Sequence, residues 1–199
     1  MNKYLSWVEI DKQALLSNVQ GFKKLIGPKV KFLAVVKGNA YGHGISEVAT
    51  IIKNKVDWFG VNNLDEAQTL KKLGIEKPVL ILGYTPNERL SEVVRDGFSQ
   101  VVYNQSTVKE LRKLKKPCRI HLKVETGTQR QGLSGEELIR LAKYIKKTSA
   151  QIEGIYTQKI DIEGISTHFA TLEEEENAFY QKQIRRFERE LGSLKKTWH

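Results

Sequence analysis

The chain has 199 residues, of which 40% are hydrophobic and 28% are charged. This composition is that of a globular protein long enough to bury a sizeable core. The only cysteine, Cys118, excludes an internal disulfide and fits a reducing compartment. No apolar run approaches the roughly 20 residues of a membrane-spanning helix, and the first residues do not resemble a signal peptide. We therefore expect a cytoplasmic protein that does not interact with membranes.

The formal net charge of +10 raises the question of a nucleic-acid partner. The basic residues are spread in short clusters, such as Lys115-Lys116, Lys146-Lys147 and Lys195-Lys196, near the ends of predicted helices. Cations stabilise the negative end of a helix dipole. Solvated helix surface explains the charge better than a nucleic-acid interface, and an anionic cofactor also tolerates a positive field.

Short apolar runs alternate along the chain with helical patterns. An extended or strand segment at 7–11 precedes a helix that ends at Gly27-Pro28. Strands are predicted at 31–36, 58–61, 78–82, 100–103, 118–124 and near 151–166. Helices are predicted around 45–52, 67–74, 90–94, 108–111, 138–145 and 180–191.

Six alternations of strand and helix, with connections too long for hairpins, indicate a parallel sheet with right-handed crossovers. An open doubly wound sheet and a closed barrel both fit this pattern. The first predicted sheet strand lacks a glycine-rich dinucleotide turn after it, which weighs against the first alternative. The predicted class is therefore α/β.

Residues 31–44 form the most informative stretch. A short apolar strand ends at Lys37, and three glycines with Asn39, Tyr41 and His43 follow before the next helix. A lysine at a strand end, partly desolvated, loses its proton more easily and attacks a carbonyl. The glycine loop and the helix start suit a phosphate. Amine and phosphate cradle together suggest pyridoxal 5'-phosphate.

Residues 34–44, Ala-Val-Val-Lys-Gly-Asn-Ala-Tyr-Gly-His-Gly, closely resemble the cofactor-lysine motif of alanine racemases. The resemblance implies that Lys37 binds the cofactor covalently and is the base for one antipode, and that Tyr41 contacts the phosphate. It also implies a (β/α)8 TIM-barrel fold, in which chemistry lies at the carboxyl ends of the strands.

A second string, residues 121–132, is similar to the racemase stretch that ends in an active-site arginine. Strand alternation sends His121 and Lys123 to one face. By resemblance Arg130 faces the phenolate oxygen of the cofactor and contacts substrate, and Lys123 matches a lysine that many relatives carbamylate to orient that arginine. Gln129 departs from the family, which has a small residue there.

A third string, residues 162–170, resembles the racemase strand whose histidine lies over the cofactor ring, which assigns that role to His168. Residues 152–158 nearly repeat the phrase, with Gln158 in place of His168. We favour the second copy because it alone continues into His-Phe-Ala. No spacing of histidines and carboxylates indicates a metal site.

A closed barrel takes about 250 residues and eight strands, whereas about six βα units are predicted here. We therefore expect residues 1–199 to be a partial barrel domain, a fragment without the β-rich C-terminal domain of the family. That domain would supply the second base, a tyrosine from a partner subunit, which makes a homodimer the expected state of the full-length protein.

The expected function is racemisation of L-alanine to D-alanine for bacterial peptidoglycan, with alanine as the small-molecule substrate and little activity in the fragment. The alternative is a single-domain carrier or homeostasis protein that binds pyridoxal phosphate in a similar barrel.

Overall fold

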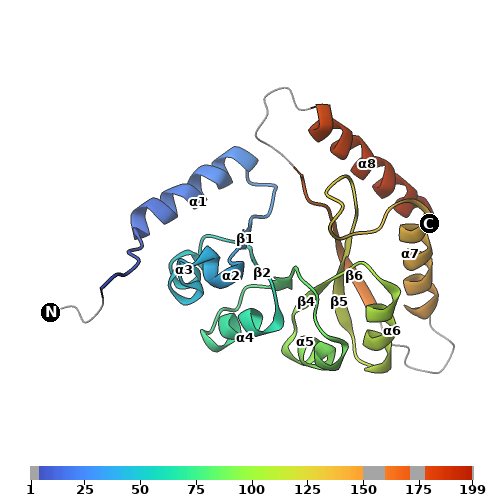
Figure 1. Ribbon diagram of the computed structural model, residues 1–199, viewed down its shortest axis with the longest axis horizontal. Helices are drawn as coiled ribbons and strands as arrows, with labels where there is room; N and C mark the ends of the chain where they lie inside the picture. The colour runs from blue at the N-terminus through green and yellow to red at the C-terminus, as the bar shows by residue number, and fades with distance from the viewer. Residues whose placement is uncertain (1–4, 150–159, 171–177, 199) are drawn as a thin grey trace. The chain divides into compact units, whose positions relative to one another are not determined.

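The computed structural model describes residues 5–149, 160–170 and 178–198. The chain divides into two compact units, Met1–Thr85 and Pro86–His199. Both units are built from parallel strands that alternate with helices, as the sequence predicts (Figure 1). Each unit is described by itself below.

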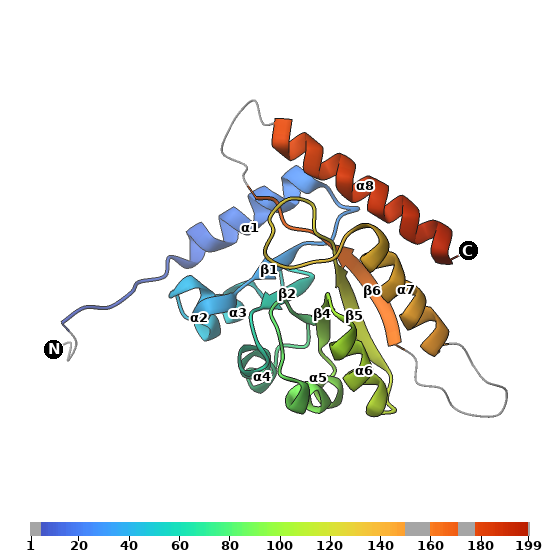
Figure 2. The ribbon, with the colours of Figure 1, turned by 45° about the vertical axis from the view of Figure 1, so that its right-hand side comes forward.

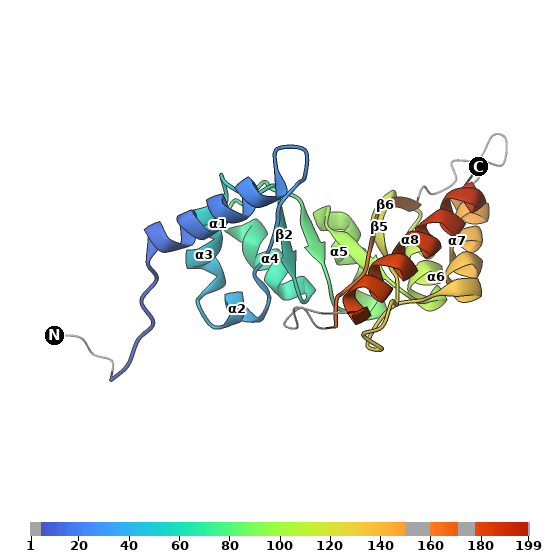
Figure 3. The ribbon, with the colours of Figure 1, turned by 90° about the horizontal axis from the view of Figure 1, so that it is seen from above.

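The first unit contains three parallel strands. Its elements are α1 (Lys12–Ile26), β1 (Leu33–Val35), α2 (Lys37–Tyr41), α3 (Ile45–Ile52), β2 (Trp58–Val61), α4 (Leu64–Lys72) and β3 (Val79–Ile81). Strand β2 pairs with β1 on one side and with β3 on the other. Helix α1 packs against α3, which is also visible from above (Figure 3). Phe59 and Val61 on the central strand are fully buried, so the unit has a core of its own.

The second unit also contains three parallel strands. Its elements are the 3-10 helix η1 (Asn87–Arg89), α5 (Leu90–Asp96), β4 (Ser99–Val102), α6 (Gln105–Lys113), β5 (Cys118–Lys123), α7 (Gly135–Ser149), β6 (Ile160–Ser166) and α8 (Ala178–Trp198). Strand β5 pairs with β4 and β6, with a register shift between Ile120 and His121. Helices α7 and α8 pack side by side (Figure 2).

Strand β5 separates an apolar face from a polar face. Ile120 and Leu122 are fully buried in a core that includes Leu138 of α7 and Leu194 of α8. His121, between them in the chain, lies on the opposite face and is only half-buried. The alternation predicted from the sequence is confirmed, because the helices cover one face of the strand.

The structure tests the predicted strand at 7–11 and the repeated segment before His168. Residues 7–11 form no strand among the described residues. Asp11, whose backbone is extended, instead caps α1 by accepting the Ala14 N–H at 3.0 Å. Strand β6 contains Gly164 of the second repeated phrase, where a Cβ would lie 2.5 Å from the His121 ring. The first copy, residues 152–158, lies outside the described residues.

Two of the three predicted basic clusters, Lys146-Lys147 and Lys195-Lys196, lie in the last turns of helices, whereas Lys115-Lys116 follows the end of α6. Paired cations occupy the last turns of α1, α4, α6, α7 and α8, namely Lys23 and Lys24, Lys71 and Lys72, Arg112 and Lys113, Lys146 and Lys147, and Lys195 and Lys196. At these positions the cations interact favourably with the negative end of the helix dipole. Within the described part of the chain, no helix combines the length and the apolar character needed to cross a bilayer.

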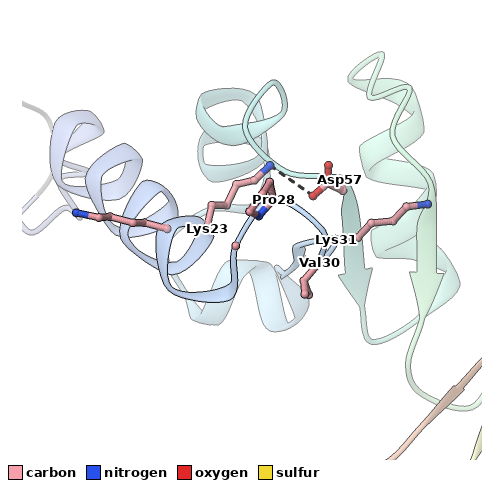
Figure 4. A pocket seen from close by; sticks show the side chains of 7 residues that line it. Lys23, Pro28, Val30, Lys31 and Asp57 are labelled. Carbon is pink, nitrogen blue, oxygen red and sulfur yellow. Dashed lines mark hydrogen bonds and ion pairs between the residues drawn. The ribbon is translucent and has the colours of Figure 1, made fainter.

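A hollow of about 480 Å³ lies at the amino end of β1. The Asp57 carboxylate beside it accepts the Phe32 N–H at 2.7 Å and forms an ion pair with Lys23 at 3.4 Å. The Lys31 side chain points away from this ion pair (Figure 4). The Phe32 N–H, aided by Lys23, holds the pKa of Asp57 below its ordinary value despite the opposing effect of partial burial. Asp57 thereby ties α1 to the start of β1, at the end of the strand away from Lys37.

We expect Asp57→Asn to lower the free energy of unfolding at pH 7 by about 0.5–1 kcal/mol, since the pair is partly exposed. Because the folded pKa is lowered, the stabilisation is complete above the ordinary pKa of about 3.9 and is lost as the pH falls through the folded pKa. Urea unfolding at pH 7 and under acid conditions measures this difference. A loss of equal size under both conditions would contradict the role of the charge.

Candidate functional site

Lys37 follows a backbone segment that the sheet holds firmly. The Val36 side chain is 1% exposed, and its N–H donates to the Gly60 carbonyl of β2 at 2.8 Å. Lys37 is the second residue after β1, and its side chain is half-buried. The predicted position of the lysine, at the carboxyl end of a strand, is confirmed. The strand is not buried throughout as predicted, because only Ala34 of β1 is buried and Val35 is 38% exposed.

The residues after Lys37 form a left-handed turn. Gly38, Asn39, Ala40 and Tyr41 have φ values of 62°, 54°, 53° and 55°. The Ala40 N–H donates to the Val36 carbonyl at 2.9 Å, and the Gly42 N–H donates to the Gly38 carbonyl at 3.0 Å. Left-handed helical backbone costs about 1–2 kcal/mol for each residue with a Cβ. The sequence predicted a glycine loop here, and the structure shows that three non-glycine residues share its strained conformation.

Asn39 joins the turn to the start of α3. Its Oδ1 accepts the Ile45 N–H at 2.9 Å, and its carbonyl accepts the Gly44 N–H at 2.9 Å. Gly44 has a φ of 91°, and a Cβ there would lie 2.2 Å from the Glu47 carboxylate. The strained turn and the first turn of the next helix are therefore one hydrogen-bonded assembly.

Glu66 of α4 was not identified from the sequence. One of its carboxylate oxygens accepts the Gly38 and Asn39 N–H groups at 2.6 and 3.2 Å, and the other accepts the Asn62 N–H at 2.7 Å. The available signal was Asn63 three residues earlier, a pairing typical of a helix start. Asn63 does cap α4, but the Glu66 carboxylate is directed at the two loops.

The Lys37 and Tyr41 side chains flank this turn. Tyr41 is 63% exposed. Across the described residues, neither the Lys37 ammonium nor the Tyr41 hydroxyl has a hydrogen bond or an ion pair within the protein. Both groups are therefore available to a ligand.

In the second unit, Glu125 organises the turn that carries Arg130. Burial opposes ionisation of Glu125, but backbone N–H groups of Gln129, Gly127, Arg130 and Thr128 outweigh it and hold the pKa of Glu125 below its ordinary value. Gln129, which departs from the racemase pattern, adopts a φ of 53°. The Arg130 side chain is exposed.

The His168 segment is fastened to the same turn. The Thr128 hydroxyl donates to the His168 carbonyl at 2.6 Å. Gln183 of α8 is fully buried, and its side-chain nitrogen donates to that carbonyl and to the Thr126 hydroxyl, each at 3.1 Å. The structure thus brings the Arg130 turn and His168 together. Sequence reasoning missed Gln183 because it lies within a helix predicted only as amphipathic.

The polar face of β5 contacts polar side chains of the neighbouring strands β4 and β6. His121 lies 3.4 Å from the Glu163 carboxylate, which also accepts the Ser99 hydroxyl at 2.6 Å. Burial lowers the pKa of His121, and Glu163 offsets only part of this effect. Lys123, at the end of β5, is half-buried and pairs in register with Ser166. The Ser166 hydroxyl is buried and has no hydrogen bond among the described residues.

Comparison with known proteins identifies a family to which this chain is similar. The family described as "Alanine racemase, N-terminal domain" matches residues 10–198. Alanine racemase 1 of Caldanaerobacter subterraneus is 37% identical over 199 residues, which is 95% of this chain and 48% of the relative. An alanine racemase of Listeria monocytogenes is 35% identical over 192 residues, or 96% of this chain and 50% of the relative. The chain spans about half the length of the curated relatives it matches.

Solved structures agree. An alanine racemase of Clostridium difficile in complex with cycloserine has a TM-score of 0.87 at 29% identity, covering 98% of this chain and 53% of that one. The Bacillus anthracis enzyme with bound L-Ala-P has a TM-score of 0.85 at 32% identity, covering 96% of this chain and 48% of that one. The fold class predicted from the sequence, an incomplete (β/α)8 barrel of six βα units, is confirmed.

We expect Glu125→Gln to loosen the Arg130 turn and to lower the free energy of unfolding at pH 7 by about 1–2 kcal/mol, the range for hydrogen bonds to a charged group. Because the folded pKa of Glu125 is lowered, the contribution is present above about pH 4.3 and is lost as the pH falls through the folded pKa. Denaturant unfolding across acid pH measures it. If the variant and the wild-type chain lost stability in parallel down to low pH, the role of the ionised carboxylate would be excluded.

Proposed function

The chain belongs to the family of alanine racemase N-terminal domains, and on this premise we propose that it forms the cofactor-binding part of an enzyme that interconverts L-alanine and D-alanine. The whole-length relatives are named for this activity. Because the chain spans about half of their length, we expect these residues alone to racemise alanine far more slowly than a whole-length racemase.

The residues of the first unit fit pyridoxal phosphate as the cofactor. A half-buried lysine without a protein partner among the described residues suits a covalent bond to an aldehyde carbon. Tyr41, four residues later, has an exposed hydroxyl that can donate to a phosphate oxygen. When bound, the cofactor supplies an electron sink for negative charge that develops at the substrate α-carbon.

Each remaining role is carried over from the racemase resemblance. Lys37 holds the cofactor and moves a proton at the α-carbon of alanine as one of two bases. Arg130 places a permanent positive charge beside the phenolate oxygen and contacts substrate, because a guanidinium stays charged there. His168 is the residue that would lie over the cofactor ring. Lys123 is the candidate for carbamylation, which would orient Arg130.

The single observation that carries the proposal is the environment of Lys37. Its backbone is fixed between the buried, hydrogen-bonded Val36 and a strained turn, while its amine has no protein partner among the described residues. Surface lysines that only add solubility have no need of such a rigid support.

The family also favours a racemase over the single-domain carrier, since the relatives reported above are all named alanine racemases. We further propose a cytoplasmic location and alanine as the substrate, with a product used in peptidoglycan. We propose a homodimer for the full-length protein. The chain has a single cysteine, Cys118, which suits a reducing compartment.

We expect the wild-type chain mixed with pyridoxal phosphate to develop the visible absorbance of a lysine-bound cofactor, and Lys37→Ala to lose it. Borohydride reduction followed by peptide mass spectrometry should place the added pyridoxyl group on Lys37. Lys31→Ala, which removes an exposed lysine at the amino end of β1, should leave the signal unchanged. Equal labelling of Lys37→Ala and the wild-type chain would contradict the proposal.

A further inference from the structure

We infer that Glu66 is a positioning residue for Lys37, acting by clamping the left-handed turn that follows the lysine. The inference rests on the proposed function, because the position of the amine matters only if Lys37 binds the cofactor. Glu66 itself contacts backbone, not the cofactor or the substrate.

The Glu66 carboxylate joins the loops that follow β1 and β2. Oε1 accepts the N–H groups of Gly38 and Asn39, and Oε2 accepts the N–H of Asn62. Gly38 is the residue immediately after Lys37. A single side chain therefore fixes the first two peptide groups of the strained turn against the neighbouring loop.

These contacts fix the position of the Lys37 backbone, from which its side chain extends. On one side, Val36 is buried and hydrogen-bonded to Gly60 of β2. On the other side, the Gly38 N–H is held by Glu66 at 2.6 Å. Lys37 lies between two fixed peptide groups, so its backbone cannot rotate freely and the direction of its Cα–Cβ bond is set.

An ionised carboxylate suits this task for an electrostatic reason. The first N–H groups of a helical turn have no carbonyl partner within the turn, and successive N–H groups that point the same way attract an anion. Hydrogen bonds to a charged acceptor are stronger than neutral ones. Glu66 thus helps to offset the conformational cost of Asn39, Ala40 and Tyr41 at positive φ.

Capping of α4 does not account for Glu66. The cap is supplied by Asn63, whose Oδ1 accepts the Glu66 N–H at 3.0 Å. Asp65, in the same first turn, is exposed and carries the same charge near the same helix dipole. Asp65→Ala is therefore a matched control, because it removes a charge from the same helix start and leaves the Glu66 carboxylate in place.

The test compares the full wild-type chain with Glu66→Ala, Glu66→Gln and Asp65→Ala, after circular dichroism has confirmed that each is folded. Hydrogen–deuterium exchange without cofactor reports the protection of the Gly38 and Asn39 amides. The rate of borohydride-trapped pyridoxyl-Lys37 formation at saturating pyridoxal phosphate reports the position of the amine.

In Glu66→Ala we expect exchange of the two amides to speed up by about tenfold or more, the loss of a charged hydrogen bond, and Lys37 trapping to slow by a similar factor. Glu66→Gln, which keeps the volume and one acceptor oxygen, should fall between Glu66→Ala and the wild-type chain. It also serves as the test variant if Glu66→Ala does not fold. Asp65→Ala should match the wild-type chain in both measurements.

The two possible failures are distinguishable. A wild-type chain that yields no pyridoxyl-Lys37 contradicts the proposed function, and with it the inference. A wild-type chain that is labelled normally, combined with unchanged amide exchange or unchanged trapping in both Glu66 variants, overturns the inference alone.

Discussion

The conformational cost of left-handed backbone after Lys37 is the constraint on which the first unit depends. Three residues with side chains adopt positive φ there, a conformation that an isolated peptide avoids. It persists because the surrounding groups over-determine it. Val36 is fixed to β2, Asn39 binds the start of α3, and Glu66 reaches across from α4. Strain of this kind is commonly found where a functional side chain must be held in one place.

Each of the two units uses a glutamate to hold a turn that carries a candidate functional residue. In each unit, a glutamate carboxylate accepts the backbone N–H groups of a turn that contains a residue at positive φ and a candidate cofactor ligand. Glu66 does so from the following helix, whereas Glu125 does so from within its own turn. In the second unit, Gln183 adds a buried link to α8. The rigid support of these turns thus comes from polar contacts to backbone, while the apolar cores position the strands and helices that carry them.

Sequence patterns predicted the strands, the helices and the faces of β5, because burial alternates with the period of each element. The pattern also placed Lys37 correctly at the carboxyl end of a strand. The left-handed turn was not predictable, since Ala40 and Tyr41 carry no preference for positive φ. Nor were Glu66 and Gln183, because a polar residue on a helix reads as solvated surface unless its partner loop is known. Gln129, which departs from the racemase pattern, adopts a φ of 53° that its residue type does not predict.

The handedness of residues 38–41 has a consequence for sequence variation. In ordinary helices glycine weakens the structure and alanine strengthens it, but at positive φ the order reverses, because glycine has no Cβ to clash with the backbone. Saturation mutagenesis of Ala40 should therefore tolerate glycine and reject valine and isoleucine. Substitution matrices compiled from right-handed helices will therefore underestimate how well glycine is tolerated in this stretch and overestimate how well residues with a Cβ are tolerated.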